Sequence, residues 1–241
     1  MKSILCWLLL VMVPCIAFSQ TKINRTYAVK KGETVELHFD YPKVVHISSW
    51  DKNEIGVEAT VKINGGESDS AFSISQSNAD GRVIIANKID MDKIPEAYYV
   101  KENGIKTRLN SKADLDAYLK ERTGTKISSY QQKDIEITIN IMLPSGITTE
   151  VTSVYGIVEL KDFKGPIKVD ARYGGIDASI NQANIGKIKL TNRYGKIYTN
   201  LALKPTEMKE ENFFTSLTAA PGVGPSYDLS SSYGNIYLRN P

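Results

Sequence analysis

Residues able to perform acid–base, nucleophilic or metal chemistry are scarce in this sequence. It contains two histidines, His38 and His46, and two cysteines, Cys6 and Cys15. A catalytic triad needs a histidine beside a nucleophilic serine or cysteine, and no Gly-x-Ser-x-Gly turn is present. A zinc site needs a cluster of Cys, His and carboxylate ligands, and no phosphate-binding loop or dinucleotide fingerprint occurs. We therefore predict no catalytic residues, no metal ligands and no cofactor, in a chain that is not an enzyme.

One pair of carboxylates keeps an enzymatic alternative open. Glu159 and Asp177 occupy the same position in successive copies of a short repeat. If the copies stack, both side chains face outward on adjacent rungs, where they could act as acid and base or flank a calcium ion. The same position in two further copies holds Tyr198 and Tyr237. The acidic column is therefore short, and a carbohydrate-active β-helix enzyme is the third hypothesis.

The repeat itself is a Tyr-Gly pair followed by one spacer and an apolar residue. Its four copies begin at Tyr155, Tyr173, Tyr194 and Tyr233. The period is about twenty residues, which is typical of stacked repeats that bury a continuous core between neighbours. Glycine permits a bend at each corner, where a Cβ would clash. We predict that the four tyrosines form an outward column with about 4.8 Å per rung, and they are the candidate ligand-binding residues. The structural alternative is that the rings only pack on one another and shield the bend.

The elements that carry this column are predicted to be short strands. Apolar and polar residues alternate at Val35, Leu37 and Phe39 and again over 135–141, with the period of half-buried strands. The predicted fold class is therefore all-β: a single-stranded β-helix or β-solenoid-like repeat domain with a short helical insertion. An antiparallel β-sandwich is the alternative, since short regular strands suit it too.

The chain divides into segments by composition. Residues 20–91 are an N-terminal β-strand region and 134–241 are the Tyr-Gly repeat region. Residues 92–133 are charged and form a predicted insertion, in which Ser111 could cap a helix that runs to about Arg122. Residues 204–226 interrupt the last repeat and are predicted to be a loop that carries Phe213-Phe214. The chain ends on a strand, where Arg239 and Pro241 would discourage edge-to-edge pairing.

Residues 1–19 are predicted to be a secretory signal peptide, with Lys2, an apolar run and Ala17-Phe18-Ser19 as the cleavage site. Cleavage would remove both cysteines, although Cys15 leaves lipidation as an alternative. No second long apolar segment follows, so no transmembrane helix is expected in the mature chain. The net charge of +3 comes from 30 basic and 27 acidic residues that are interspersed, which argues against a nucleic-acid partner. The sequence does not predict the oligomeric state.

Several motifs together resemble the DUF4097 family of adhesin-like exported bacterial proteins. They are Lys31-Gly32, Trp50-Asp51 with Glu54-Ile55 and Val57, Leu143-Pro144-Ser145-Gly146, and the Tyr-Gly series. The resemblance implies a β-helix-like fold and a location in the bacterial envelope, and the leader ending Phe18-Ser19-Gln20 is similar to those of Bacteroidetes. We expect an exported adhesin-like protein in the periplasm, on the outer membrane surface or secreted, which binds an envelope glycan or protein. The alternative is a structural or regulatory envelope protein with a protein partner.

Overall fold

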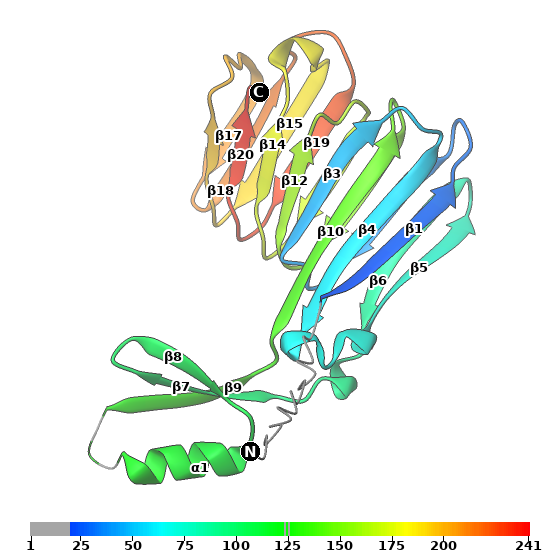
Figure 1. Ribbon diagram of the computed structural model, residues 1–241. Coiled ribbons are helices and arrows are strands. Elements are labelled where there is room, and N and C mark those ends of the chain that lie inside the picture. The colour runs from blue at the N-terminus through cyan, green and yellow to red at the C-terminus, as the bar shows by residue number, and fades with distance from the viewer. Residues whose placement is uncertain (1–19, 123, 125) are drawn as a thin grey trace, which may run out of the picture.

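The computed structural model describes residues 20–122, 124 and 126–241, and the predicted signal peptide lies outside this range. The described residues form two large sheets that face each other and a smaller third sheet at one end (Figure 1). The predicted all-β class is confirmed. The facing sheets also fit the sandwich alternative.

The first sheet combines parallel repeat strands with an antiparallel end. Its described strands are, in spatial order, β1 (Thr21–Ala28), β4 (Glu54–Ile63), β10 (Ile135–Pro144), β3 (Val44–Trp50), β12 (Ile157–Lys161), β14 (Ile176–Ser179), β20 (Ile236–Arg239) and β16 (Ile197–Thr199). From β10 to β16 every neighbouring pair is parallel, whereas β1, β4 and β10 pair antiparallel.

The second sheet has antiparallel hairpins at both ends. Its described strands are, in spatial order, β17 (Pro205–Glu211), β18 (Phe214–Ala219), β15 (Lys187–Arg193), β19 (Ser226–Ser231), β13 (Ile167–Ala171), β11 (Thr148–Ser153), β2 (Thr34–Phe39), β6 (Arg82–Ile89) and β5 (Phe72–Ala79). The strands from β15 to β6 are all parallel to their neighbours.

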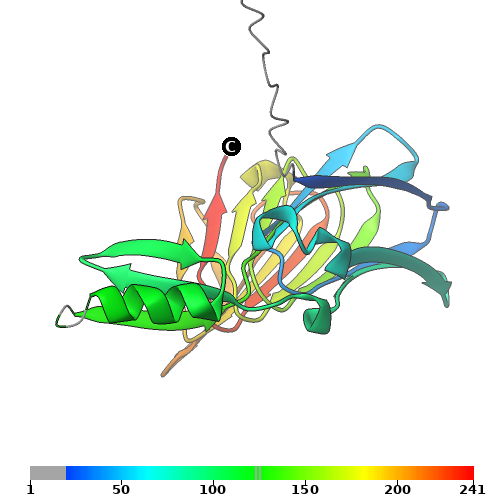
Figure 2. The ribbon, with the colours of Figure 1, turned by 60° about the horizontal axis from the view of Figure 1, so that its bottom comes forward.

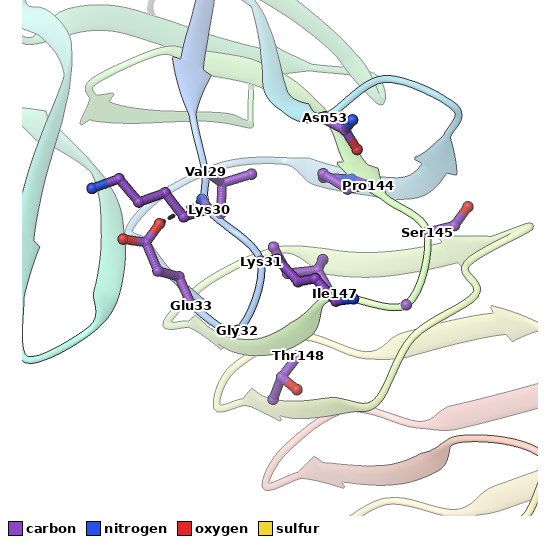
Figure 3. Close-up of a pocket in the computed structure, with 11 residues that line it drawn as sticks. Val29, Lys30, Lys31, Gly32, Glu33, Asn53, Pro144, Ser145, Ile147 and Thr148 are labelled. Atoms are coloured by element: carbon purple, nitrogen blue, oxygen red, sulfur yellow. Dashed lines mark hydrogen bonds between the residues drawn. The ribbon is translucent and has the colours of Figure 1, made fainter.

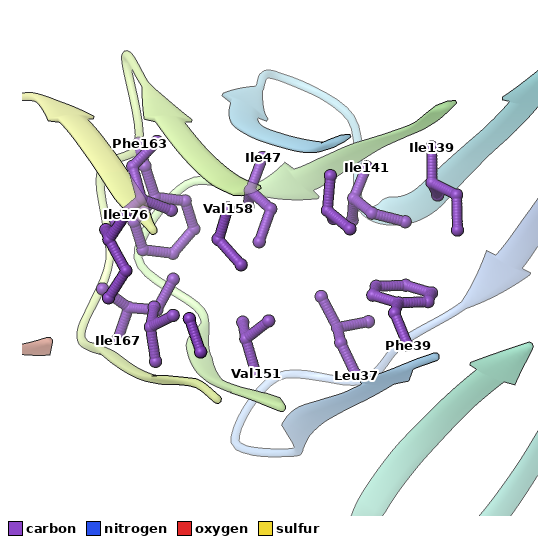
Figure 4. Packing of buried hydrophobic residues seen from close by; sticks show 14 of the residues in the cluster. Leu37, Phe39, Ile47, Ile139, Ile141, Val151, Val158, Phe163, Ile167 and Ile176 are labelled. Atoms are coloured by element: carbon purple, nitrogen blue, oxygen red, sulfur yellow. The ribbon is translucent and has the colours of Figure 1, made fainter. Parts of the chain in front are cut away.

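Each repeat forms one rung, which we define as a strand of the second sheet, a tight turn and the next strand in the first sheet. Five rungs stack in the order β2–β3, β11–β12, β13–β14, β19–β20 and β15–β16 within the described residues. Alternation places every second side chain of both sheets in the space between them, and Figure 4 shows this core with Leu37, Phe39 and Val151 opposite Ile47, Ile141 and Val158. Removing these apolar surfaces from water is the main stabilising contribution.

The stacking order corrects one expectation. The last repeat does not lie at the end of the stack, because β19–β20 lies between β13–β14 and β15–β16. Strand β20, which was expected to be an exposed edge, is therefore an internal strand. The hairpin β17–β18 pairs with β15 and supplies the edge of the second sheet instead. Residues 204–226, predicted to be a loop, thus contain two strands, of which β17 is charged and fully exposed and so shows no strand pattern.

The third sheet consists of β8 (Ile105–Leu109), β7 (Ala97–Glu102) and β9 (Ile127–Gln132), with α1 (Lys112–Glu121) against one face (Figure 2). The predicted helix cap is confirmed, since the Ser111 hydroxyl accepts a hydrogen bond of 3.1 Å from the Asp114 backbone N–H. No helix in the described ranges is both long and apolar enough to cross a membrane.

Candidate functional site: an aromatic ladder

The turns within the rungs carry one continuous stack of aromatic rings, which we call the aromatic ladder. Its members are, in spatial order, Tyr41, Tyr155, Tyr173, Tyr233, Tyr194 and Phe213. The ring centroids are 4.8 Å apart for the first pair, 5.1 Å for each of the next three pairs and 5.7 Å for the last. The four predicted tyrosines are thus brought together, although Tyr233 lies between Tyr173 and Tyr194 rather than after them.

Glycine makes this spacing possible, because the turns below the rings stack backbone on backbone. A Cβ on Gly174 would lie 1.6 Å from the carbonyl oxygen of Gly156, and one on Gly234 would lie 2.2 Å from the carbonyl oxygen of Gly174. Neither contact can be relieved by a side-chain rotation, because both involve main-chain atoms. The Tyr-Gly pair therefore has two roles, in which glycine sets the close approach and tyrosine covers it.

Three buried polar side chains hold the turns from inside. The Ser153 hydroxyl donates to the Tyr155 carbonyl at 2.9 Å, and the Ser231 hydroxyl lies 2.9 Å from the Gly174 carbonyl. Asn192 donates to the Gly234 carbonyl and accepts from the Gly195 N–H, at 2.8 Å each. Turns this tight leave backbone groups without partners, so these side chains satisfy donors and acceptors that would otherwise be buried unpaired.

Two ladder members were missed by the sequence analysis. Tyr41 begins a fifth turn, in which Pro42 follows the tyrosine and the buried Val45 comes one residue later than in the Tyr-Gly copies. Phe213 comes from the β17–β18 hairpin rather than from a repeat. Tyr41, Tyr194 and Phe213 have φ of 63°, 58° and 60°, in the left-handed region that bulky residues rarely adopt. The signal for Tyr41 was present in the alternating residues on both sides of Tyr41-Pro42. No repeat pattern pointed to Phe213.

The stacking decides which atoms the ladder offers to a partner. Interplanar angles between 5° and 28° keep neighbouring rings nearly parallel, so the inner ring faces are covered by each other. The side chains are nonetheless exposed, by 54% at Tyr173, 57% at Tyr233 and 61% at Tyr194. The exposed parts are therefore ring edges and phenol hydroxyls. Among the described residues, phenol hydroxyls form hydrogen bonds at Tyr118, Tyr227 and Tyr237, but at no ladder tyrosine.

The carboxylates considered for catalysis lie side by side on the first sheet, but each has a partner. Glu159 and Asp177 are register neighbours on β12 and β14. Glu159 Oε2 lies 2.9 Å from His46 Nδ1, and Asp177 contacts the Arg239 guanidinium. No group of three or more His, Cys, Asp and Glu residues that could hold a metal ion occurs in the described part of the chain. Both carboxylates therefore lie at the surface, each in contact with a basic side chain.

A pocket of about 580 Å³ lies away from the ladder, at the opposite corner of the rungs. Its lining includes Lys31, Gly32, Asn53 and Pro144-Ser145, so three turns converge there (Figure 3). The Glu33 carboxylate accepts a hydrogen bond of 2.7 Å from the Lys30 backbone N–H and so stabilises its own loop. This corner joins β1 to β2 and β10 to β11, and we assign it a structural role.

No family model and no curated protein matches the chain. Two solved structures are similar to it. One is a "putative cell adhesion protein" from Clostridium sporogenes, with 12% identity and a TM-score of 0.45 over 92% of this chain and 100% of that chain. The other is a "putative adhesin" from Bacteroides fragilis, with 13% identity and a TM-score of 0.23 over 91% of this chain and 98% of that chain. Identities and TM-scores this low carry no conclusion about the function of this chain.

Proposed function

We propose that this chain is an exported, non-catalytic contact protein of a bacterial envelope that binds a glycan along the aromatic ladder. The observation that carries the proposal is the row of exposed ring edges whose hydroxyls form no hydrogen bond with the residues that the structure describes. A tyrosine combines an apolar body with a polar tip, and this combination is enriched at contact surfaces.

A regular row suits a regular ligand. The central hydroxyl-bearing rings repeat every 5.1 Å, so they offer one polar contact per rung to an extended polymer. Sugars present hydroxyls that both donate and accept, as do the tyrosine hydroxyls. Because the inner ring faces are covered, a sugar would contact the ladder through hydrogen bonds and ring edges, and could stack only at the free end.

A protein partner is the second candidate, and strand β16 favours it. This strand is the last of the first sheet among the described strands, and its Tyr198 stacks on Tyr237 at 5.1 Å. An edge strand beside exposed aromatic rings is a site where an extended segment of another chain can add to the sheet.

The test separates the ladder hydroxyls from the ladder stacking. The double variant Tyr173→Phe/Tyr233→Phe keeps both rings and removes two hydroxyls, whereas Tyr130→Phe removes an exposed hydroxyl from the third sheet as a matched control. Binding of purified protein to glycan arrays and isolated cell-wall polysaccharide is measured beside thermal unfolding. Two lost hydrogen bonds of roughly 0.5–1.5 kcal/mol each predict binding weaker by about tenfold, with unchanged stability. Equal glycan binding by the double variant and the wild type would contradict binding through the ladder hydroxyls. Recovery of one protein partner without any glycan would favour the second candidate.

A further inference from the structure

We infer that the glycan bound by the ladder is acidic, with carboxylates of uronic-acid type along its chain; this inference rests on the proposed function. Its basis is the charge beside the ladder. Four exposed cations lie within two residues of ladder tyrosines, at Lys43, Arg172, Arg193 and Lys196. They come from the Tyr41, Tyr173 and Tyr194 turns.

Two other arginines of the body form ion pairs, whereas Arg25 on β1 is exposed and forms none among the described residues. Arg82 contacts Glu36 and Glu150 at 3.3 Å and 3.2 Å, and Arg239 contacts Asp177. By contrast, none of the four cations that flank the ladder forms an ion pair with a carboxylate among the described residues. Their charge therefore remains available to an external anion.

Acidic residues are almost absent from the same turns. The five Tyr-containing turns hold one carboxylate, at Asp40, and its Oδ1 is buried without a hydrogen-bond partner. Desolvation raises the pKa of Asp40, against a smaller lowering from the Tyr41 backbone N–H. At the hairpin end Glu211 pairs with Lys209, so the exposed charges left unpaired in the described ladder turns are positive, although basic and acidic residues of the whole chain nearly balance at 30 and 27. Such a local excess attracts a ligand of the opposite sign and increases its rate of association.

The end of the ladder offers a place for one sugar ring. A pocket of about 350 Å³ opens there, lined by Arg193, Lys209, Glu211, Phe213 and Phe214 among others. Lys209 pairs with Glu211 at 3.0 Å, so Arg193 is the cation without an ion pair among these described lining residues. Phe213 stacks on Tyr194 with one face and is 73% exposed, so its other face can take the apolar face of a sugar. The Arg193 guanidinium lies 5.3 Å from the Phe214 ring centroid, at the same pocket. Arginine can bind a carboxylate with two parallel hydrogen bonds.

The left-handed φ of Phe213 is consistent with this use. The turn between β17 and β18 contains Asn212 and Phe213, and the positive φ of Phe213 is one that favours glycine or asparagine. A bulky side chain at this φ makes the folded protein less stable than glycine would. Residues with strained backbone angles are often found at functional sites. The turn holds a phenylalanine ring on the free end of the ladder, where a glycine would leave Tyr194 uncovered.

The experiment compares polygalacturonate with dextran, an uncharged glycan, as probes for the full-length purified protein. The triple variant Arg172→Gln/Arg193→Gln/Lys196→Gln removes three flanking cations. The control Lys168→Gln/Lys187→Gln/Lys189→Gln removes the same charge from exposed lysines on the outer face of the second sheet. We expect polygalacturonate binding that weakens with added salt and that falls about tenfold in the flank variant, while the control stays near the wild type.

Other outcomes overturn the inference in distinguishable ways. Equal losses in both triple variants would show attraction by net charge alone. Tighter binding to vesicles with anionic lipid, or to single-stranded DNA, would assign the cations to another class of ligand. Dextran binding that is lost in Tyr173→Phe/Tyr233→Phe but kept in the flank variant would leave the proposed function standing and refute only the acidic ligand. Polygalacturonate binding lost in the flank variant but unchanged in Tyr173→Phe/Tyr233→Phe would refute the ladder as the contact surface.

Discussion

Single residues determine how closely the rungs approach each other. The Tyr-Gly pair was recognised in the sequence because it recurs, and the predicted reason for its glycine, space for a bend, is close to what the structure shows. The more exact reason is contact between rungs, since the Gly174 Cα faces the carbonyl of Gly156. In the Tyr41 turn, at the end of the ladder, Pro42 follows the tyrosine. Its carbonyl oxygen would lie 1.8 Å from a Cβ on Gly156 of the next turn. The buried Asn192 and Ser231 could not be predicted as turn anchors, because the register that places them beneath the turns is formed by distant strands.

Substitution of Gly174 tests this crowding. Gly174→Ala places a Cβ against main-chain atoms, so we expect it to lower the free energy of unfolding by about 3 kcal/mol or more. Gly104→Ala is the matched control, because φ of Gly104 is +84° but no atom lies within 4 Å of its added Cβ. That control should lose only about 1 kcal/mol. Urea unfolding of both variants checks the prediction, which fails if the two changes are equally destabilising.

Tyr227 gives a prediction for alkaline pH. Burial raises its pKa, and its hydroxyl donates to the Phe163 carbonyl at 3.1 Å. The folded protein therefore keeps this proton at a pH where the unfolded chain releases it. The resulting stability is complete below the ordinary tyrosine pKa of about 10 and is lost as the pH rises from there through the raised pKa. Tyr227→Phe should be less stable at pH 8 but should lose less further stability above pH 10, as urea unfolding at both values would show. Parallel pH curves would contradict the assignment.

At the scale of elements, local patterns predicted the strands but not their neighbours. Alternating residues located β2, β10 and the repeat strands because each strand buries one face. The stacking order was not available from the same pattern, since the third and fourth Tyr-Gly repeats present equivalent faces and either could follow β13–β14. Pairing of β15 with the β17–β18 hairpin leaves β15–β16 at the end and admits β19–β20 inside. Strand β17 had no apolar alternation to reveal it, because all of its residues are exposed.

Truncation tests the internal position of the last rung. A chain that ends at Pro225 lacks four large buried side chains, at Tyr227, Leu229, Ile236 and Leu238. At about 1.5–3 kcal/mol each, their loss approaches the whole stability of a typical domain. We expect this chain to lose cooperative thermal unfolding by circular dichroism.

The control deletes an edge instead. Joining Lys204 to Ala220 removes the β17–β18 hairpin, whose ends, Pro205 and Ala219, are register partners. This variant should still unfold cooperatively, although at a lower temperature. If the chain ending at Pro225 proved the more stable of the two, this would contradict the internal position of β19–β20.

At the scale of the molecule, the parallel rungs convert a short repeat into a long surface. Strands in register repeat each outward residue at nearly constant spacing, so the aromatic ladder and its flanking cations follow from stacking rather than from any one loop. The sequence could predict the tyrosine column for this reason. It could not predict that the ring faces cover each other, or that Glu159 and Asp177 find separate partners, because both depend on side-chain directions across rungs.

The most direct test of the ladder as the contact surface is chemical footprinting of its tyrosines. The purified protein is treated with tetranitromethane, free and bound to the cell-wall polysaccharide, and nitration is located by mass spectrometry. We predict that Tyr173, Tyr233 and Tyr194 react in the free protein and are protected in the complex, while Tyr130 of the third sheet reacts equally in both. Ladder tyrosines that remain equally reactive in the complex, or protection at Tyr130 alone, would contradict the account.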